Sequence, residues 1–166
     1  MNRYLVCSDI HGQIENFKYA LKEASMDGLD GVLIAGDTEL EPSVLQELVN
    51  ETGAKLYLVR GNCDYAYGRD LRDFLTITLP GGIVCMLTHG HKYSVKSDVF
   101  TLVSVADNLG ANLIIYGHTH SYDDSKIGSM RVVNPGALCG SFFSHPSYIL
   151  MTIDGNRIEM LRRVIG

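Results

Sequence analysis

The first half of the chain alternates short apolar runs with amphipathic segments. Three runs rich in β-branched, aromatic or aliphatic residues predict buried strands at 4–7, 32–35 and 56–59. Between them, apolar residues recur at helical spacing in one segment from Ile14 to about Met26 and in another that begins at Pro42. Alternating strands and helices predict right-handed crossover units and a parallel sheet.

The pattern loosens in the second half. Its expected elements, in chain order, are a half-exposed strand at 73–79, a turn at 80–82, a strand at 83–87, a helix from Ser97 or Asp98 to Gly110, a strand at 113–116, short strands around Lys126 and at 130–133, a turn at 134–136, and a hairpin of 148–153 and 157–164. We therefore expect a second, mixed sheet that packs against the first.

Composition and charge narrow the class of protein. The chain has 166 residues, of which 46% are hydrophobic and 20% charged, as in one ordinary globular domain spanning 1–166. No apolar run has the roughly 18 residues that a membrane span needs, and the N-terminus shows no signal-peptide pattern, so we expect a cytoplasmic protein. The net charge of −5 and the lack of a basic stripe argue against nucleic acid as a partner.

The cysteines exclude two familiar kinds of site. The four residues, Cys7, Cys63, Cys85 and Cys139, lie far apart and form no C-x-x-C pair. This spacing argues against a zinc ribbon and against a thioredoxin-like redox site, and it predicts no disulfides.

Polar residues that could bind a metal follow the ends of five predicted strands. They are Asp9, His11, Asp37, Asn62, His89, His118 and His120. Any one of them has a plain alternative as a turn aspartate or a polar histidine near the core. The joint pattern favours a site, because four of the six histidines come directly after apolar strands and α/β folds bind ligands beyond the carboxyl ends of strands.

These seven side chains offer oxygen and nitrogen ligands but no thiolate. The set is too large for one tetrahedral ion and suits two divalent cations that share a carboxylate, drawn from Mn²⁺, Fe²⁺, Co²⁺, Ni²⁺, Zn²⁺ and Mg²⁺. Two such ions bring more positive charge than the two aspartates remove, so the site would attract phosphate. Water between the two metals would lose its proton readily and act as a hydroxide nucleophile.

The motifs Asp9-Ile10-His11, Gly36-Asp37, Gly61-Asn62-Cys63-Asp64, Thr88-His89-Gly90 and Gly117-His118-Thr119-His120 resemble those of the calcineurin-like metallophosphoesterases. The resemblance covers nearly the whole chain, with the motifs in the family's order and spacing. It is greatest to the small, single-domain phosphodiesterases of bacteria and archaea.

This resemblance implies a fold and a site. The fold would be an α/β double β-sandwich flanked by helices, with four layers in the order αββα. The first metal would be held by Asp9, His11 and His120, the second by Asn62, His89 and His118, and Asp37 would bridge the two. The activity would be hydrolysis of a small phosphate ester, most simply a phosphodiester, by a metal-bridging hydroxide. Mn²⁺ is the expected metal, and a homo-oligomer is compatible with the family.

The residue after Asn62 departs from the family pattern. Many relatives have a histidine there that can protonate the leaving group, whereas this chain has Cys63. A neutral thiol is a poor general acid, so we expect a preference for leaving groups that need little protonation. Three residues are weak catalytic candidates: Cys63, Asp64 and His91. Cys63 would act as a nucleophile, but a buried or idle thiol is the favoured alternative. Asp64 would orient a ligand or merely close the turn, and His91 would contact the substrate or a metal-bound water, or simply lie at the surface.

Three other functions compete with a phosphodiesterase. The small retromer subunit resembles the same family and serves as a scaffold with an impaired metal site, but here all seven ligand positions are filled. A phosphomonoesterase would use the same ligands. A nuclease would call for a basic groove or an added capping domain, which the acidic balance and the short chain disfavour.

Overall fold

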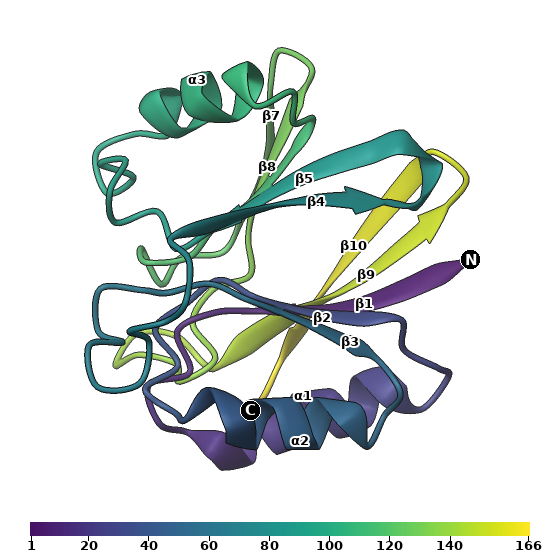
Figure 1. The fold of residues 1–166 in the computed structure, drawn as a ribbon, viewed down its shortest axis with the longest axis vertical. Helices are drawn as coiled ribbons and strands as arrows, with labels where there is room; N and C mark the ends of the chain where they lie inside the picture. Colours follow the sequence, from purple (N-terminus) through teal and green to yellow (C-terminus); the bar gives the residue numbers. More distant parts are fainter.

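The computed structural model describes residues 1–166, in which two five-stranded sheets stack face to face (Figure 1). The first sheet has the order β10 (Arg157–Val164), β9 (Ser147–Asp154), β1 (Asn2–Cys7), β2 (Gly31–Ile34), β3 (Lys55–Leu58). The second has the order β4 (Phe74–Leu79), β5 (Ile83–Thr88), β6 (Leu113–Ile115), β8 (Met130–Asn134), β7 (Asp123–Ile127).

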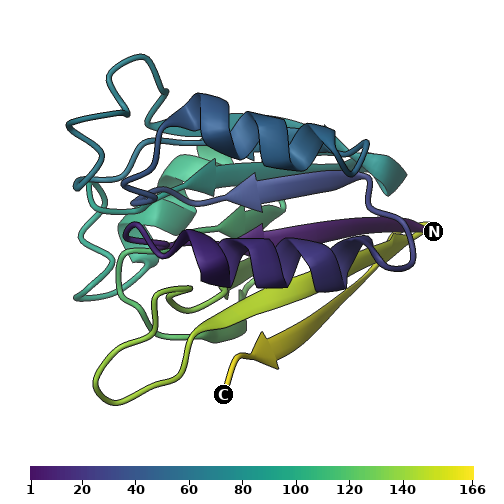
Figure 2. The ribbon, with the colours of Figure 1, turned by 90° about the horizontal axis from the view of Figure 1, so that it is seen from below.

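Helices cover the outer face of each sheet. Helices α1 (Ile14–Ser25) and α2 (Pro42–Asn50) lie side by side on the first sheet, and α3 (Phe100–Asn108) lies on the second (Figures 1 and 2). A short 3₁₀ turn, η1 (Pro80–Gly82), joins β4 to β5. This arrangement confirms the predicted four layers. It also explains the continuous apolar runs, because strands covered on both faces need apolar residues at successive positions.

Neighbouring residues of one strand therefore enter different cores. On β1, Val6 packs between the two sheets, whereas Leu5 packs against the helices α1 and α2. The core between the sheets holds 16 buried residues, including Leu33 of β2 and Leu113 of β6. The two sheets are thus held together by apolar burial on facing strands. No helix of the chain is both long enough and apolar enough to cross a bilayer.

The C-terminal hairpin differs from the expected arrangement. Instead of adding to the second sheet, β9 pairs antiparallel with β1, with Leu150 opposite Leu5, and β10 follows it at the margin of the molecule (Figure 2). The first sheet is therefore mixed rather than purely parallel. The local alternation of apolar and polar residues predicts the hairpin, but it does not predict which strand β9 pairs with. That strand is β1, whose free edge comes beside β9 only in the folded chain. The second sheet is mixed, as expected.

Candidate metal centre

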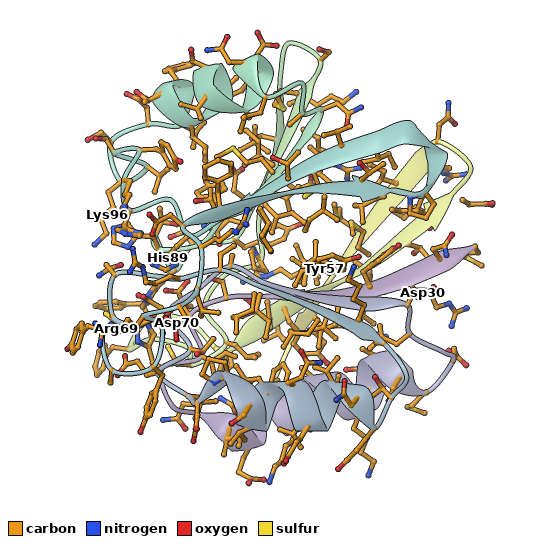
Figure 3. All side chains as sticks on the ribbon, in the orientation of Figure 1. Asp30, Tyr57, Arg69, Asp70, His89 and Lys96 are labelled. Atoms are coloured by element: carbon orange, nitrogen blue, oxygen red, sulfur yellow. The ribbon has the colours of Figure 1, made fainter.

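The loops that follow the parallel strands meet at one end of the sandwich. Backbone hydrogen bonds join them: Asp9 N–H donates to the Gly36 carbonyl at 3.0 Å, and Gly117 N–H donates to the His89 carbonyl at 3.0 Å. The first bond links loops of the first sheet, and the second links loops of the second sheet. His89 is labelled in Figure 3, where it lies at this end between the two sheets. The carboxyl ends of both sheets thus bring their polar side chains to a common site.

One group of candidate ligands comprises Asp9, His11 and His120. Asp9 Oδ1 lies 3.1 Å from His120 Nε2 and 3.4 Å from His11 Nε2. The other carboxylate oxygen, Oδ2, accepts hydrogen bonds from Ser8 Oγ at 2.7 Å and from His118 N–H at 3.1 Å. These two bonds fix the carboxylate so that Oδ1 faces the imidazoles.

A second group comprises Asp37, His89 and His118. His89 Nε2 lies 3.1 Å from Asp37 Oδ2, and the His89 and His118 rings are 5.0 Å apart. His89 Nδ1 donates to the carbonyl of Ala35 at 2.7 Å, which leaves Nε2 free to act as a ligand. The fully buried imidazole is thereby held in a single orientation.

The two groups adjoin, and their facing atoms lack partners. His11 Nε2 lies 3.7 Å from Asp37 Oδ2, and His89 Nε2 lies 3.9 Å from Asp9 Oδ1. Asp9 Oδ1, His11 Nε2 and His89 Nε2 are all buried without a hydrogen bond. Unpaired buried polar atoms are costly, whereas bound cations would satisfy all three. The donor set of carboxylates and imidazoles fits divalent metal ions.

The same residues share an uncommon backbone conformation. Left-handed φ angles occur at Asp9 (55°), His11 (45°), Asp37 (51°), His118 (68°) and His120 (61°). Few residues other than glycine adopt this region, and such conformations gather at functional sites where the surrounding structure holds them. Aspartate and histidine tolerate it better than β-branched residues do.

The charges of the site favour cations. Burial would raise the pKa of Asp9, but the nearby His11 and His120 imidazoles outweigh it and hold that pKa well below its ordinary range. Asp37 has a lowered pKa because its pairing with His89 outweighs burial. The nearby Asp9 carboxylate, reinforced by Glu39, raises the pKa of His11 to about 9. Metal ions would take the place of the protons that the imidazoles otherwise hold.

Other residues named by the sequence lie around this centre. Asn62 is exposed, with its amide nitrogen 3.6 Å from Cys63 Sγ, and its role as a ligand stays a prediction. Cys63 is half-buried and its N–H donates to Asp37 Oδ1 at 2.7 Å. Burial, together with the nearby Asp37 carboxylate, raises the pKa of the Cys63 thiol to about 11, so the thiol is neutral in this state. That charge state argues against Cys63 as a nucleophile.

His91 lies beside the second group. Its ring is 5.4 Å from that of His89 and 6.2 Å from that of His118, and its buried Nδ1 has no hydrogen-bond partner. Burial, together with the neighbouring His89, lowers the pKa of His91. Its neutral ring stays a candidate for contact with a substrate.

Sequence reasoning missed Glu39, and it gave Asn134 only as part of a turn. Glu39 Oε1 lies 2.5 Å from His11 Nδ1, so it orients the imidazole whose Nε2 faces the candidate metal. Asn134 Nδ2 donates to the Gly117 carbonyl and to Thr119 Oγ1, both at 3.0 Å, and so supports the loop that carries His118. A signal for Glu39 was present, because Asp37-x-Glu39 repeats the spacing of Asp9-x-His11.

Comparison with known proteins identifies the family. The model of the calcineurin-like phosphoesterase superfamily domain matches residues 3–156. This chain belongs to that superfamily. Its membership and the two ligand groups make this phosphoesterase a metal-dependent hydrolase of phosphoesters.

Individual relatives carry related names. The phosphoesterase is 31% identical over 157 residues to a probable metallophosphoesterase of Methanothermobacter thermautotrophicus, covering 93% of this chain and 87% of the relative. It is 28% identical over 155 residues to phosphodiesterase YfcE of Escherichia coli, covering 83% of this chain and 80% of the relative.

Solved structures share the fold. A predicted phosphoesterase of Streptococcus pneumoniae superposes with a TM-score of 0.81 at 24% identity, covering 98% of this chain and 89% of that one. Vacuolar Protein Sorting 29 of Cryptosporidium parvum superposes with a TM-score of 0.75 at 21% identity, covering 99% and 98% of the two chains. At these identities the superpositions show the double β-sandwich and nothing of the activity.

Proposed function

We propose that this chain is a phosphodiesterase that uses two divalent metal ions, with Mn²⁺ as the first choice. The proposed ligands are Asp9, His11 and His120 for one ion, Asn62, His89 and His118 for the other, and Asp37 between them. The observation that carries the proposal is the set of three buried, unpaired ligand atoms that face one another across two adjoining groups. Relatives named phosphodiesterase support the choice of substrate class.

The protein's own groups would prepare this site. When bound, the metal ions supply Lewis-acid stabilisation of a phosphoryl group and lower the pKa of water. The lowered pKa values of Asp9 and Asp37 keep both carboxylates ionised and able to bind cations at neutral pH. The hydrogen bond from His89 to Ala35, and that between His11 and Glu39, hold the two imidazoles in the orientation that ligation needs. The substrate would then bind a rigid surface.

Two rival functions have specific support. The likeness in fold to Vacuolar Protein Sorting 29 fits a scaffold, but a scaffold has no need of three unpaired ligand atoms. A phosphomonoesterase would use the same centre and differ only in substrate. Nucleic acid is disfavoured by the net charge of −5. We further propose that the chain works as a single cytoplasmic domain, which can form a homo-oligomer.

The deciding experiment compares an aryl phosphodiester with an aryl phosphomonoester. Metal-stripped protein would receive Mn²⁺, Ni²⁺, Zn²⁺ or Mg²⁺ singly, beside an Asp37→Ala variant and an Asp107→Ala control on the exposed face of α3. We expect metal-dependent turnover, faster on the diester, that Asp37→Ala lowers at least 10²-fold and Asp107→Ala leaves unchanged. Faster turnover of the monoester would make the chain a phosphatase. No turnover despite confirmed metal binding would favour the scaffold.

A further inference from the structure

The carboxylate of Asp64 is buried, and its hydrogen-bond partners are three backbone N–H groups. Oδ2 accepts from Gly61 at 2.7 Å and from Asp37 at 2.8 Å, and Oδ1 accepts from Glu39 at 3.0 Å. Only 2% of the residue is exposed. An aspartate that merely closed its own turn would need the bond to Gly61 alone, whereas the other two bonds reach across to the loop after β2.

The backbone around Asp64 is closely packed. A Cβ atom at Gly61 would lie 2.1 Å from Asp37 Oδ1, and one at Gly68 would lie 2.6 Å from Asp64 Cβ. The two loops therefore approach each other as closely as backbone allows. The hydrogen bonds of Asp64 span this narrow gap, together with the bond from Cys63 N–H to Asp37 Oδ1 at 2.7 Å.

The bonds to Asp37 and Glu39 hold a strained segment. Both residues have a φ of 51°, in the left-handed region that non-glycine residues rarely adopt. Asp37 directs its carboxylate at His89, and Glu39 directs its carboxylate at His11 Nδ1. The buried Asp64 carboxylate thus contacts the backbone of Asp37, which belongs to the second ligand group. Through Glu39 it is also connected to His11, which belongs to the first.

We propose that Asp64 is the positioning residue for both metal ions. It fixes the backbone of Asp37 and Glu39 so that Asp37 faces the second group and Glu39 orients the imidazole of His11 in the first. This role rests on the proposed function, because it assumes that the two groups bind metal. Removal of its three acceptor contacts would loosen both metal sites together. Residues that orient metal ligands in this way typically contribute about 10- to 100-fold to metal affinity.

The test is titration of metal-free full-length protein with Mn²⁺ by calorimetry. Asp64→Asn keeps the size of the side chain but replaces one acceptor oxygen by an N–H₂ group. Glu39→Ala removes only the contact to His11, and Glu39→Gln restores an acceptor there. Asp30→Asn is the matched control, because Asp30 also accepts a backbone N–H, from Arg3 at 2.8 Å, at the opposite end of the sandwich (Figure 3).

We expect Asp64→Asn to weaken both Mn²⁺ binding events about 10- to 100-fold. Glu39→Ala should weaken one event, Glu39→Gln should largely restore it, and Asp30→Asn should change neither. The visible absorption of the Co²⁺-loaded protein, which reports ligand geometry, should change in Asp64→Asn and not in Asp30→Asn.

Three results would decide against the proposal or its foundation. Wild-type affinity at both sites of Asp64→Asn would overturn it. If Asp64→Asn failed to fold, unchanged Mn²⁺ affinities in Glu39→Ala would overturn it instead. Wild-type protein that bound fewer than two Mn²⁺ ions would refute the proposed dinuclear function itself, which separates that failure from the failure of the Asp64 inference.

Discussion

At the residue scale, the ligand candidates combine a chemistry with a conformation. Asp9, His11 and Asp37 offer carboxylate and imidazole donors, and each sits at a left-handed φ directly after a strand. The left-handed turn redirects the side chain from the strand towards the neighbouring loop. Hydrogen bonds such as that between His89 and Ala35 then select which atom faces the centre. Donor type alone would not have produced the site.

The leaving-group preference belongs to Cys63. Because its thiol has a pKa raised to about 11, chiefly by burial and the nearby Asp37, it protonates a leaving alkoxide poorly. We expect aryl diesters to be hydrolysed far faster than alkyl diesters. Cys63→His should raise kcat for alkyl diesters by roughly 10²-fold while changing aryl diesters little. Steady-state kinetics on both substrates checks this, with Tyr19→His on the exposed face of α1 as control. Equal wild-type rates on the two classes would contradict it.

The pH dependence of the metal-free protein should report His11. The nearby Asp9 carboxylate, then the hydrogen bond to Glu39, raises the His11 pKa to about 9 from the ordinary 6.5. A raised pKa stabilises the fold below pH 6.5, and this contribution is lost as the pH rises through 9. Urea denaturation in the presence of a chelator should show wild type more stable than His11→Asn at pH 6.

At pH 10 that difference in the free energy of unfolding should vanish. The exposed His145, changed to Asn, is the control for the substitution itself. A difference that stayed constant between pH 6 and pH 10 would show that His11 stabilises the metal-free fold without its charge.

At the element scale, the site depends on how closely the strand-end loops approach. Gly36 and Gly61 lie in adjacent loops, where a Cβ at Gly36 would be 2.8 Å from Gly61 N. Asn134 at the end of β8 adds hydrogen bonds to the loop after β6. The strands thus fix where each loop begins, and the small residues let the loops meet.

Gly61→Ala tests this packing. The added methyl group would lie 2.1 Å from Asp37 Oδ1 and 2.5 Å from Asp37 N, so the ligand or its backbone must move. We expect Mn²⁺ affinity to fall at least tenfold, measured by calorimetry. The matched control is Gly31→Ala, where the new methyl group would lie 2.8 Å from the Tyr4 ring and 3.4 Å from the Lys55 carbonyl oxygen and would meet no ligand candidate. It should reduce stability and leave Mn²⁺ affinity unchanged. Equal affinities in both variants would contradict the argument.

At the scale of the whole molecule, the largest apolar cluster is the core between the two sheets, with 16 buried residues. It draws on β1, β2 and β9 of the first sheet and on β4, β5, β6 and β8 of the second. A second apolar cluster joins the first sheet to α1 and α2, and a third joins the second sheet to α3. The candidate metal ligands lie at one end of this sandwich, so the rigid sheets can support a site to which their own side chains contribute few atoms.

Truncation of a side chain in this core should lower the free energy of unfolding without changing Mn²⁺ binding. Leu113 is fully buried between the sheets, so we expect Leu113→Ala to lower the free energy of unfolding by about 2–5 kcal/mol. Leu161 on β10 is 52% exposed, and Leu161→Ala should change the free energy by less than about 0.5 kcal/mol. Urea denaturation gives both values. Loss of Mn²⁺ binding by folded Leu113→Ala would show that core and site are coupled.

The sequence alone predicted the helices and strands and most of the candidate metal ligands. Strands and helices follow from local periodicity, because buried strands and amphipathic helices place apolar residues at different spacings. The order of strands and polar residues also indicated that Asp9, His11, Asp37, His89, His118 and His120 would meet. Parallel strands end at the same edge, and this topological rule needs no coordinates.

Only the tertiary structure decided the rest. Whether β9 joins the first or the second sheet depends on which strand edge is free in the folded chain. The roles of Glu39 and Asp64 rest on hydrogen bonds to an imidazole and to backbone N–H groups. Every residue except proline carries such an N–H group, so no sequence pattern marks the ones that a buried carboxylate will reach. The candidate metal ligands could be predicted from their order along the chain, whereas the residues that position them became visible only in the folded structure.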